Sequence, residues 1–223
     1  MTPTDTHTAA VTAASAAATA ENVARAGLRE RKKQATRAAL SQAALRLAVD
    51  RGFDHVTVED IAAAVDVSPR TFNNYFRSKQ EAICALGITR AERLGAALDA
   101  RPVEEDLWDA ITEAVLAHFD DSPIEPDRSW ITAVRLVMTA PSLQGEYLKV
   151  NLAMQRVLGE AIAQRAGLGE DDMLPMILAG SVIAACQVAV ERWLAADASI
   201  ALEPLLRQAL NQLASAPRRR TSG

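Results

Sequence analysis

Aromatic residues, glycine, proline and cysteine are all scarce in this sequence, and the shortages narrow the possible folds. Aromatic residues make up 4% of the 223 residues, with ten glycines and nine prolines, and alanine dominates the 49% that are hydrophobic. Alanine is the most favourable helix former, whereas glycine and proline are the least favourable. No stretch alternates apolar and polar residues with the period of two that a half-buried strand requires. These features predict an all-α fold.

Cysteine pairs and catalytic motifs are also missing. Cys84 and Cys186 stand far apart, so the sequence indicates neither a disulfide framework nor a zinc site, and buried thiols in a reducing cytoplasm are expected. No P-loop, His-Glu-x-x-His motif, nucleophile elbow or dinucleotide fingerprint occurs, which predicts no enzyme activity, no metal and no cofactor. His118 with Asp120 and Asp121 could mimic a metal cluster, but the neighbouring prolines favour a solvated turn.

One long run, Met173–Val190, carries no charged residue and approaches transmembrane length. Because it contains Pro175 and many alanines between acidic flanks, we interpret it as a helix buried by protein, and we expect no membrane partner. Residues 1–26 lack the basic start and apolar core of a signal peptide, so we expect a disordered N-terminal tail on a cytoplasmic protein. Residues 217–223 are expected to form a basic disordered tail.

Charge is unevenly divided along the chain, whose net charge is −4. Residues 28–82 contain ten Lys/Arg and seven Asp/Glu, a balance of +3, whereas residues 83–217 contain ten and nineteen, a balance of −9. This asymmetry suggests that the first segment meets a polyanion. Its basic residues concentrate at Arg29, Arg31, Lys32, Lys33 and Arg37. A solvated helix start would carry the same residues, so charge alone leaves both interpretations open.

Two short helices are predicted after a long first one. Residues 29–51 have helical periodicity and end at Gly52, which is typical of a helix C-terminus. Thr57, with an acid three positions on, predicts a capping box, and Ser68-Pro69 are typical of an N-cap and first helical residue. Helices over 57–65 and 68–75, joined by a tight turn, form a helix-turn-helix unit.

The second of these short helices divides into an apolar and a polar side. The positions expected to form the small core of the unit are Ile61, Val65, Val67, Phe72 and Phe76. The outer positions of the second helix are Arg70, Thr71, Asn73, Asn74 and Tyr75. Arginine pairs with guanine and asparagine with adenine, while hydroxyls and lysine hold phosphates, so this side suits reading of DNA.

From Gly52 to Ala82 the sequence resembles the DNA-binding head of the TetR family of transcriptional regulators. The family pattern is matched by Gly52-Phe53, Thr57-Val58, Ile61-Ala62, Val67-Ser68, Thr71, Tyr75-Phe76 and Lys79. Asn73 departs from the pattern, because the family often has an aromatic residue there. The resemblance covers residues 33–82, and the rest of the chain agrees in length and helix number alone.

The resemblance implies a homodimeric regulator with a helix-turn-helix domain (27–82, continuing into a linking helix 79–98) and an effector-binding and dimerisation domain (99–216). It implies a repressor that a small-molecule effector releases from a palindromic operator in double-stranded DNA. Two alternatives remain: a transcriptional activator, or a ligand-sensing or protein-partner module that does not bind DNA. Residues implied to contact DNA are Arg31, Lys32, Lys33, Thr57, Ser68, Arg70, Thr71, Asn73, Asn74, Tyr75 and Lys79. Of these, Arg70, Asn73 and Asn74 are expected to read bases.

The body offers larger side chains among its many alanines as effector-binding candidates. These are Trp108, His118, Phe119, Trp130, Arg135, Met138, Tyr147, Met154 and Gln187. The last two helices are implied to form a four-helix bundle with the partner subunit. Candidates for that interface are Met176, Gly180, Ile183, Ala184, Trp193, Leu206 and Leu210.

Overall fold

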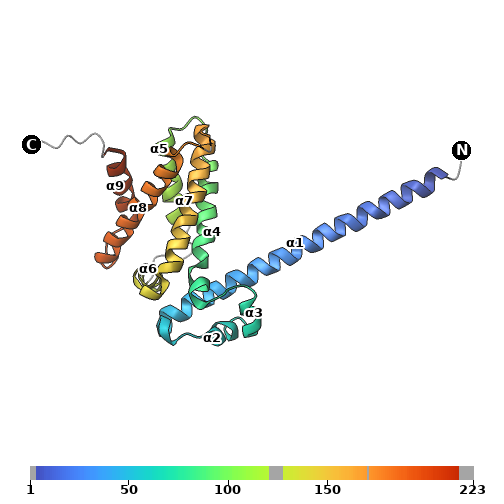
Figure 1. The fold of residues 1–223 in the computed structure, drawn as a ribbon, viewed down its shortest axis with the longest axis horizontal. Helices are drawn as coiled ribbons and strands as arrows, with labels where there is room; N and C mark the ends of the chain where they lie inside the picture. The colour runs from blue at the N-terminus through green and yellow to red at the C-terminus, as the bar shows by residue number, and fades with distance from the viewer. Residues whose placement is uncertain (1–3, 121–127, 170, 216–223) are drawn as a thin grey trace, which may run out of the picture.

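The computed structural model describes residues 4–120, 128–169 and 171–215. These residues form nine α-helices and no strand, which confirms the predicted all-α fold (Figure 1). The helices are α1 (Thr4–Arg51), α2 (Val58–Ala63), α3 (Pro69–Asn73), α4 (Lys79–Asp99), α5 (Leu107–Asp120), α6 (Arg128–Thr139), α7 (Gln144–Ala166), α8 (Leu174–Ala195) and α9 (Leu202–Ser215). Helix α4 connects a head of α1–α3 to a body of α5–α9. Most of the turn expected beside His118, and the whole of the tail expected over 217–223, lie outside the described residues.

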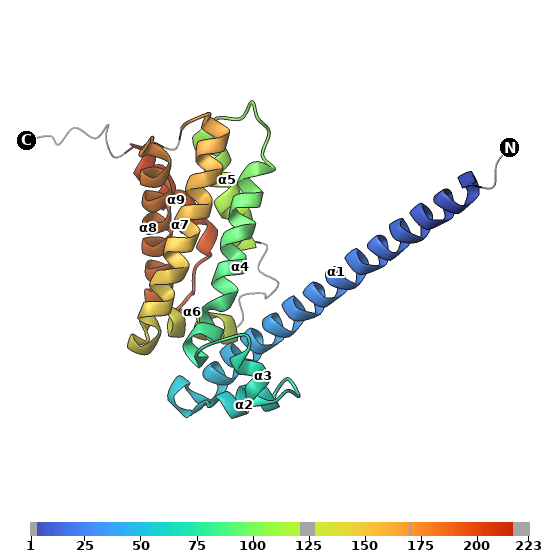
Figure 2. The ribbon, with the colours of Figure 1, turned by 45° about the vertical axis from the view of Figure 1, so that its right-hand side comes forward.

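Helix α1 differs from the prediction of a disordered tail over residues 1–26. It is helical from Thr4 and continues without a break to Arg51, and its first half extends away from the rest of the molecule (Figures 1 and 2). The segment from residue 4 to 26 contains no glycine or proline and is rich in alanine. Alanine fixes its backbone in a helix at the lowest cost of any residue, so the helix extends through this segment.

The core of the head is built as the sequence pattern predicts. Ile61, Phe72 and Phe76 are buried against the apolar face of α1, and the Phe72 and Phe76 rings lie 5.7 Å apart. The same cluster extends into the body through Leu143 and Val150, so the head and the body share packed side chains. The head is therefore held to the body by more than the single helix α4.

Glycines let α4 lie close against α7 in the body. A Cβ atom added at Gly87 would come within 2.5 Å of a Val150 methyl group, and one at Gly95 within 2.6 Å of a Val157 methyl group. Space this narrow excludes any larger residue unless the helices separate. The distance between α4 and α7 is thus set by valine methyl groups of α7 that rest on the α4 backbone at the two glycines.

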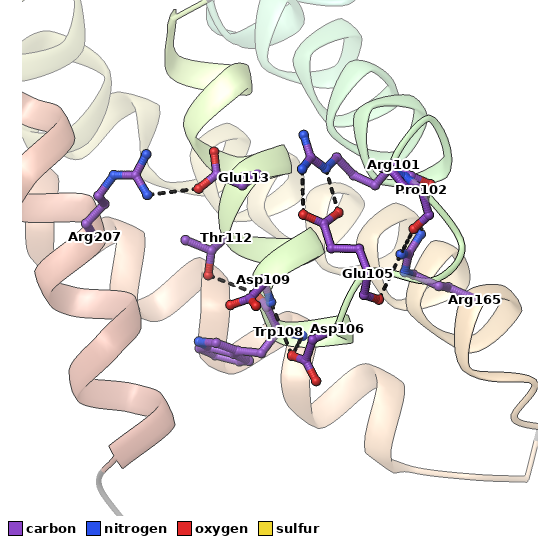
Figure 3. A network of polar contacts seen from close by, with 10 residues as sticks. All are labelled: Arg101, Pro102, Glu105, Asp106, Trp108, Asp109, Thr112, Glu113, Arg165 and Arg207. Carbon is purple, nitrogen blue, oxygen red and sulfur yellow. Dashed lines mark hydrogen bonds and ion pairs between the residues drawn. The ribbon is translucent and has the colours of Figure 1, made fainter.

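Polar contacts fix the far end of α4 (Figure 3). The Arg165 guanidinium at the end of α7 donates hydrogen bonds to the carbonyl oxygens of Arg101 (3.1 Å), Pro102 and Glu105 (3.2 Å) in the α4–α5 connection. Arg101 in turn pairs with the Glu105 carboxylate through two nitrogens. The Arg207–Glu113 ion pair joins α9 to α5 at 2.8 Å.

Helix α8 is the helix of the described residues that is long and apolar enough to span a membrane, judged by length and composition alone. About a third of its most apolar stretch (33%) is buried inside the protein. It lies between α7 and α9 and contributes Val182, Ala189 and Trp193 to the core. Its opposite side exposes Ile177 and Val188 to solvent.

Candidate nucleic-acid interface

Helix α3 presents a polar surface over a buried aromatic residue. The Ser68 hydroxyl accepts a hydrogen bond from the Thr71 backbone N–H (3.1 Å), and Pro69 follows as the first helical residue, as predicted. Phe72 is fully buried, and this anchors one side of the helix. Arg70 and Asn73 are exposed on the other side, next to the exposed cap residue Asn74. The three predicted base-reading residues are thus brought together at the surface.

The helix is shorter than the predicted span, ending at Asn73 rather than near Tyr75. Tyr75 is half-buried and packs against the head core, as Phe76 does. The hydroxyls of Ser68 and Thr71 lie 2.9 Å apart and share one hydrogen bond, so one hydroxyl proton of the pair remains to donate to a phosphate.

The turn before α3 depends on one residue with an unusual backbone conformation. Asp66 has a φ of 54°, in the left-handed region, and Val67 N–H donates to the Ala62 carbonyl oxygen at 3.0 Å. Aspartate adopts this conformation more readily than most other residues. The turn thereby sets the angle between α2 and α3.

Thr57 forms the capping box that the sequence predicts. Its hydroxyl donates to the Asp60 carboxylate (2.6 Å) and accepts from the Asp60 N–H (3.1 Å), while its own N–H donates to that carboxylate (2.9 Å). These hydrogen bonds, aided by Arg51, hold the pKa of Asp60 below its usual value. Both Thr57 donors are used within the protein, so a contact from Thr57 to phosphate would require the cap to open.

Lys79, which is predicted to contact phosphate, makes contacts within the head. Its ammonium group donates hydrogen bonds to the carbonyl oxygens of Phe53 (2.9 Å) and Val56 (2.8 Å), and it lies 4.3 Å from the centroid of the Phe53 ring. Two of its three N–H donors are therefore used within the head. The structure assigns Lys79 to holding the start of α4 against the connection between α1 and α2.

The predicted basic residues lie on α1 ahead of the head core. Arg31, Lys32 and Lys33 are all exposed, as is Arg29. Arg37 lies over the Phe76 ring with its guanidinium carbon 4.9 Å from the ring centroid. These cations are therefore held by α1 rather than by a separate arm.

Part of the predicted effector set gathers at one place in the body. Phe119, Trp130 and Met138 pack around Trp193, whose ring centroid is 5.3 Å from that of Trp130. His118 is buried, with its ring edge-on to that of Phe119. This aromatic cluster joins α5, α6 and α8.

Arg135 lies beside this cluster, where its guanidinium donates to the Leu194 carbonyl oxygen (3.4 Å), whereas the remaining effector candidates belong to other contacts. Arg135 pairs with Asp197, and Gln187 donates to Glu191. Burial raises the pKa of Tyr147 on α7, and Met154 packs between the two larger cores. Trp108 lies at the start of α5, where its indole N–H is buried without an acceptor among the described residues.

The predicted dimer residues divide between core and surface. Trp193, Leu206 and Leu210 are buried in the protomer's own core, and Ile183 is half-buried there, so they offer little surface to a partner. The apolar spacing of α9 predicts a buried face, but it does not tell whether that face packs on its own subunit. Met176 and Ala184 are exposed, and Gly180 lies against Gln155 of α7.

Exposed apolar residues that the sequence reading missed lie on α7 and α8. They are Leu148, Leu152, Met173, Ile177 and Val188, which we call the α7–α8 face. The charge-free run Met173–Val190 was the signal for the α8 part of this face, and the spacing of four between Leu148 and Leu152 was the signal for the α7 part. Beside this face, a groove of about 640 Å³ is lined by Gln155, Met173, Met176, Ile177 and Gly180 among others.

Comparison with known proteins extends the likeness over nearly the whole chain. Residues 40–83 match the sequence model described as bacterial regulatory proteins, tetR family, and residues 105–217 match the one described as MftR C-terminal domain. The HTH-type transcriptional regulator TcmR of Streptomyces glaucescens is 36% identical over 195 residues, covering 84% of this chain and 86% of TcmR. MftR of Mycobacterium tuberculosis is 28% identical over 183 residues, covering 81% and 90%.

A solved structure agrees in fold. The FadR repressor of Thermus thermophilus, of the same family and solved with lauroyl-CoA, superposes with a TM-score of 0.55. It is 17% identical and covers 83% of this chain and 97% of its own. This likeness supports the arrangement of a helix-turn-helix head on a helical body.

Proposed function

This chain belongs to the TetR family and is a DNA-binding transcriptional regulator, and from that premise we propose that it represses transcription as a homodimer released from its operator by a small molecule. The observation that carries the proposal is the exposed set Arg70, Asn73 and Asn74 held over the buried Phe72. A regulator of this kind acts on DNA in the bacterial cytoplasm. Catalysis has no part in the proposal.

Sequence preference comes from α3 in the major groove. Arg70 can contact the O6 and N7 atoms of guanine through two nitrogens, and Asn73 and Asn74 suit adenine. The remaining hydroxyl proton of the Ser68–Thr71 pair contacts the phosphate backbone and helps fix the register. Tyr75 lies next to these residues, and its half-buried ring allows the hydroxyl to reach the backbone.

The α7–α8 face is the surface through which two copies associate. Ile177 and Val188 expose 57% and 61% of their surface, and Met173 exposes 74%. Exposed apolar residues of this size are typical of an interface where they gather on one face. The outward residues of α9 are polar by contrast, including Glu203, Arg207, Gln208 and Asn211. A two-fold dimer would place two α3 helices on a palindrome.

The effector site lies at the aromatic cluster of Phe119, Trp130 and Met138. Helix α6, which carries Trp130 and Met138, also contacts α1 of the head, so a molecule bound there can favour one head position over another. Such a shift requires unequal affinity for the two states. The apolar lining makes lauroyl-CoA, the ligand of the Thermus protein, a suitable first probe.

Selection of bound duplexes from random DNA by the purified chain tests the proposal. We expect a palindromic site whose half-sites are read with the help of Arg70. Arg70→Ala should cost about 1–3 kcal/mol and relax preference at one base pair in each half-site. Binding without sequence preference would contradict the assignment of α3.

A second experiment tests the dimer. Ile177→Asp should shift the chain from dimer to monomer in sedimentation analysis, because it places a charge in an apolar interface. Gln208→Asp on the polar side of α9 is the matched control and should leave the dimer intact. An Ile177→Asp variant that remains dimeric would assign the interface elsewhere.

A further inference from the structure

The turn between α8 and α9 holds two residues in an unfavourable backbone conformation. Asp197 and Ala198 have φ values of 50° and 54°, in the left-handed region. Aspartate tolerates this region better than most residues, but for alanine it costs free energy without any polar side-chain group to offset the cost. A conformation of this kind persists where the surrounding contacts hold it in place. The contacts around the turn therefore determine its shape.

Arg135 of α6 makes one of these contacts. Its guanidinium donates to the Asp197 carboxylate at 3.1 Å and, through the same nitrogen, to the Leu194 carbonyl oxygen at 3.4 Å. Leu194 belongs to the last turn of α8, whose carbonyl oxygens lack partners within the helix. One nitrogen of Arg135 thus joins the end of α8 to the first left-handed residue of the turn.

A ring contact between α6 and α8 lies beside this hydrogen bond. The Trp130 ring of α6 lies 5.3 Å from the Trp193 ring of α8, at an angle of 63°. The Trp193 indole N–H donates to the Ile200 carbonyl oxygen at 2.9 Å, where the chain leaves the turn. Helix α6 therefore contacts both the entry and the exit of the turn, through Arg135 and through Trp130.

The other side of α6 belongs to the head. Ile131 and Val134 pack in the cluster around Trp193, whereas Leu136 and Val137 pack against the cluster that includes the buried face of α1. In Figure 1 helix α6 lies at the lower end of the body, between the α8–α9 turn and α1. A displacement of α6 away from the turn would therefore also change its packing on the head.

We propose that Arg135 is a positioning residue, which holds α6 on the α8–α9 turn and thereby makes the conformation of the turn and the seating of the head on DNA depend on each other. This inference rests on the proposed function, because it requires the head to bind an operator. It gives Arg135 a role other than the predicted contact with an effector. Arg135 acts through the position of α6 and touches neither DNA nor ligand.

Hydrogen exchange of the full chain, free and bound to its selected operator, tests the proposal. The reporters are the backbone N–H groups of Asp197, Ala198 and Ser199, which donate to carbonyl oxygens at 3.1, 3.0 and 3.0 Å. In wild type, operator binding should slow their exchange, because coupling between two sites is reciprocal. Arg135→Gln should speed this exchange in the free protein by up to about five-fold, as expected of an exposed ion pair, and should remove the response to operator.

Two further variants separate the contact from the charge. Asp197→Asn removes the same ion pair but keeps a residue that tolerates the left-handed region, so it should match Arg135→Gln. The double variant should add nothing to either single change, because both remove one interaction. Arg192→Gln is the matched control: it removes an exposed cation from the last turn of α8 and should respond to operator as wild type does.

Wild-type N–H groups of the turn that exchange alike with and without operator would overturn the role of Arg135. So would an Arg135→Gln variant that keeps the full wild-type response, or an Arg192→Gln control that loses it equally. A wild-type chain that selects no operator at all would overturn the proposed function instead.

Discussion

Lys79→Met tests whether this lysine stabilises the head or holds DNA. The substitution removes two charge-assisted hydrogen bonds, to the Phe53 and Val56 carbonyl oxygens, and a contact with the Phe53 ring. Hydrogen bonds of this kind contribute about 1.5–3 kcal/mol each, but the Phe53 oxygen keeps a second donor in the Val56 N–H, and water can reach the half-buried site. We expect the free energy of unfolding to fall by about 2–4 kcal/mol.

Urea denaturation followed by circular dichroism measures this loss. Arg77→Met is the matched control, because Arg77 is an exposed cation two residues away, and the substitution keeps the backbone N–H that donates to Glu81. The control should unfold near the wild-type urea concentration. If Lys79→Met also unfolds there, and instead loses DNA affinity with a shallower salt dependence, then Lys79 contacts phosphate and the structural role is refuted.

Three further predictions concern packing, charge and thiols. Gly95→Leu should destabilise the protein by about 1–3 kcal/mol, because the larger side chain forces α4 away from Val157. Gly145→Ala should stabilise α7 by about 0.5–1 kcal/mol, because the added methyl group meets nothing within 4 Å. The urea midpoints of the two variants measure both effects. Because the pKa of Asp60 is lowered in the folded protein, this carboxylate stabilises the folded state at pH values above its ordinary pKa of 3.8. The urea midpoint of wild type should therefore exceed that of Asp60→Asn at neutral pH. The difference should disappear as the pH falls below 3.8. Burial raises the pKa of Cys84 to about 11 and that of Cys186 to about 12, so both thiols should react with a disulfide reagent in urea but hardly at all in the folded protein at neutral pH.

The predictions that the structure confirms depend on interactions between residues that are close in the sequence. The caps at Thr57 and Ser68 each place a hydroxyl three residues before the residue whose backbone N–H donates to it, so sequence alone specifies them. The aromatic core of the head follows from the helical spacing of Phe72 and Phe76. These local rules were sufficient to predict the two caps and the aromatic core of the head.

The remaining differences depend on contacts between distant residues. Leu206 and Leu210 form an apolar row, but only the folded body shows that α5 and α8 cover it rather than a second subunit. Lys79 matches a position expected at DNA, yet its reach to the Phe53 and Val56 carbonyl oxygens depends on how the connection after α1 folds back. The spacing of residues along the sequence does not reveal either of these contacts between distant parts of the chain.

The Arg165 contacts give α4 a fixed end, with a mechanical consequence for the DNA-binding end. The helix has 21 residues, so it is about 32 Å long at about 1.5 Å per residue. If α4 and the α7 helix packed against it tilt together about the anchored Arg101–Glu105 connection, a rotation of about 5° moves the other end of α4 by roughly 3 Å. Helix α4 is thus a lever whose pivot lies at the end remote from the operator, and a small rearrangement in the body becomes a displacement comparable to one base-pair step at α3.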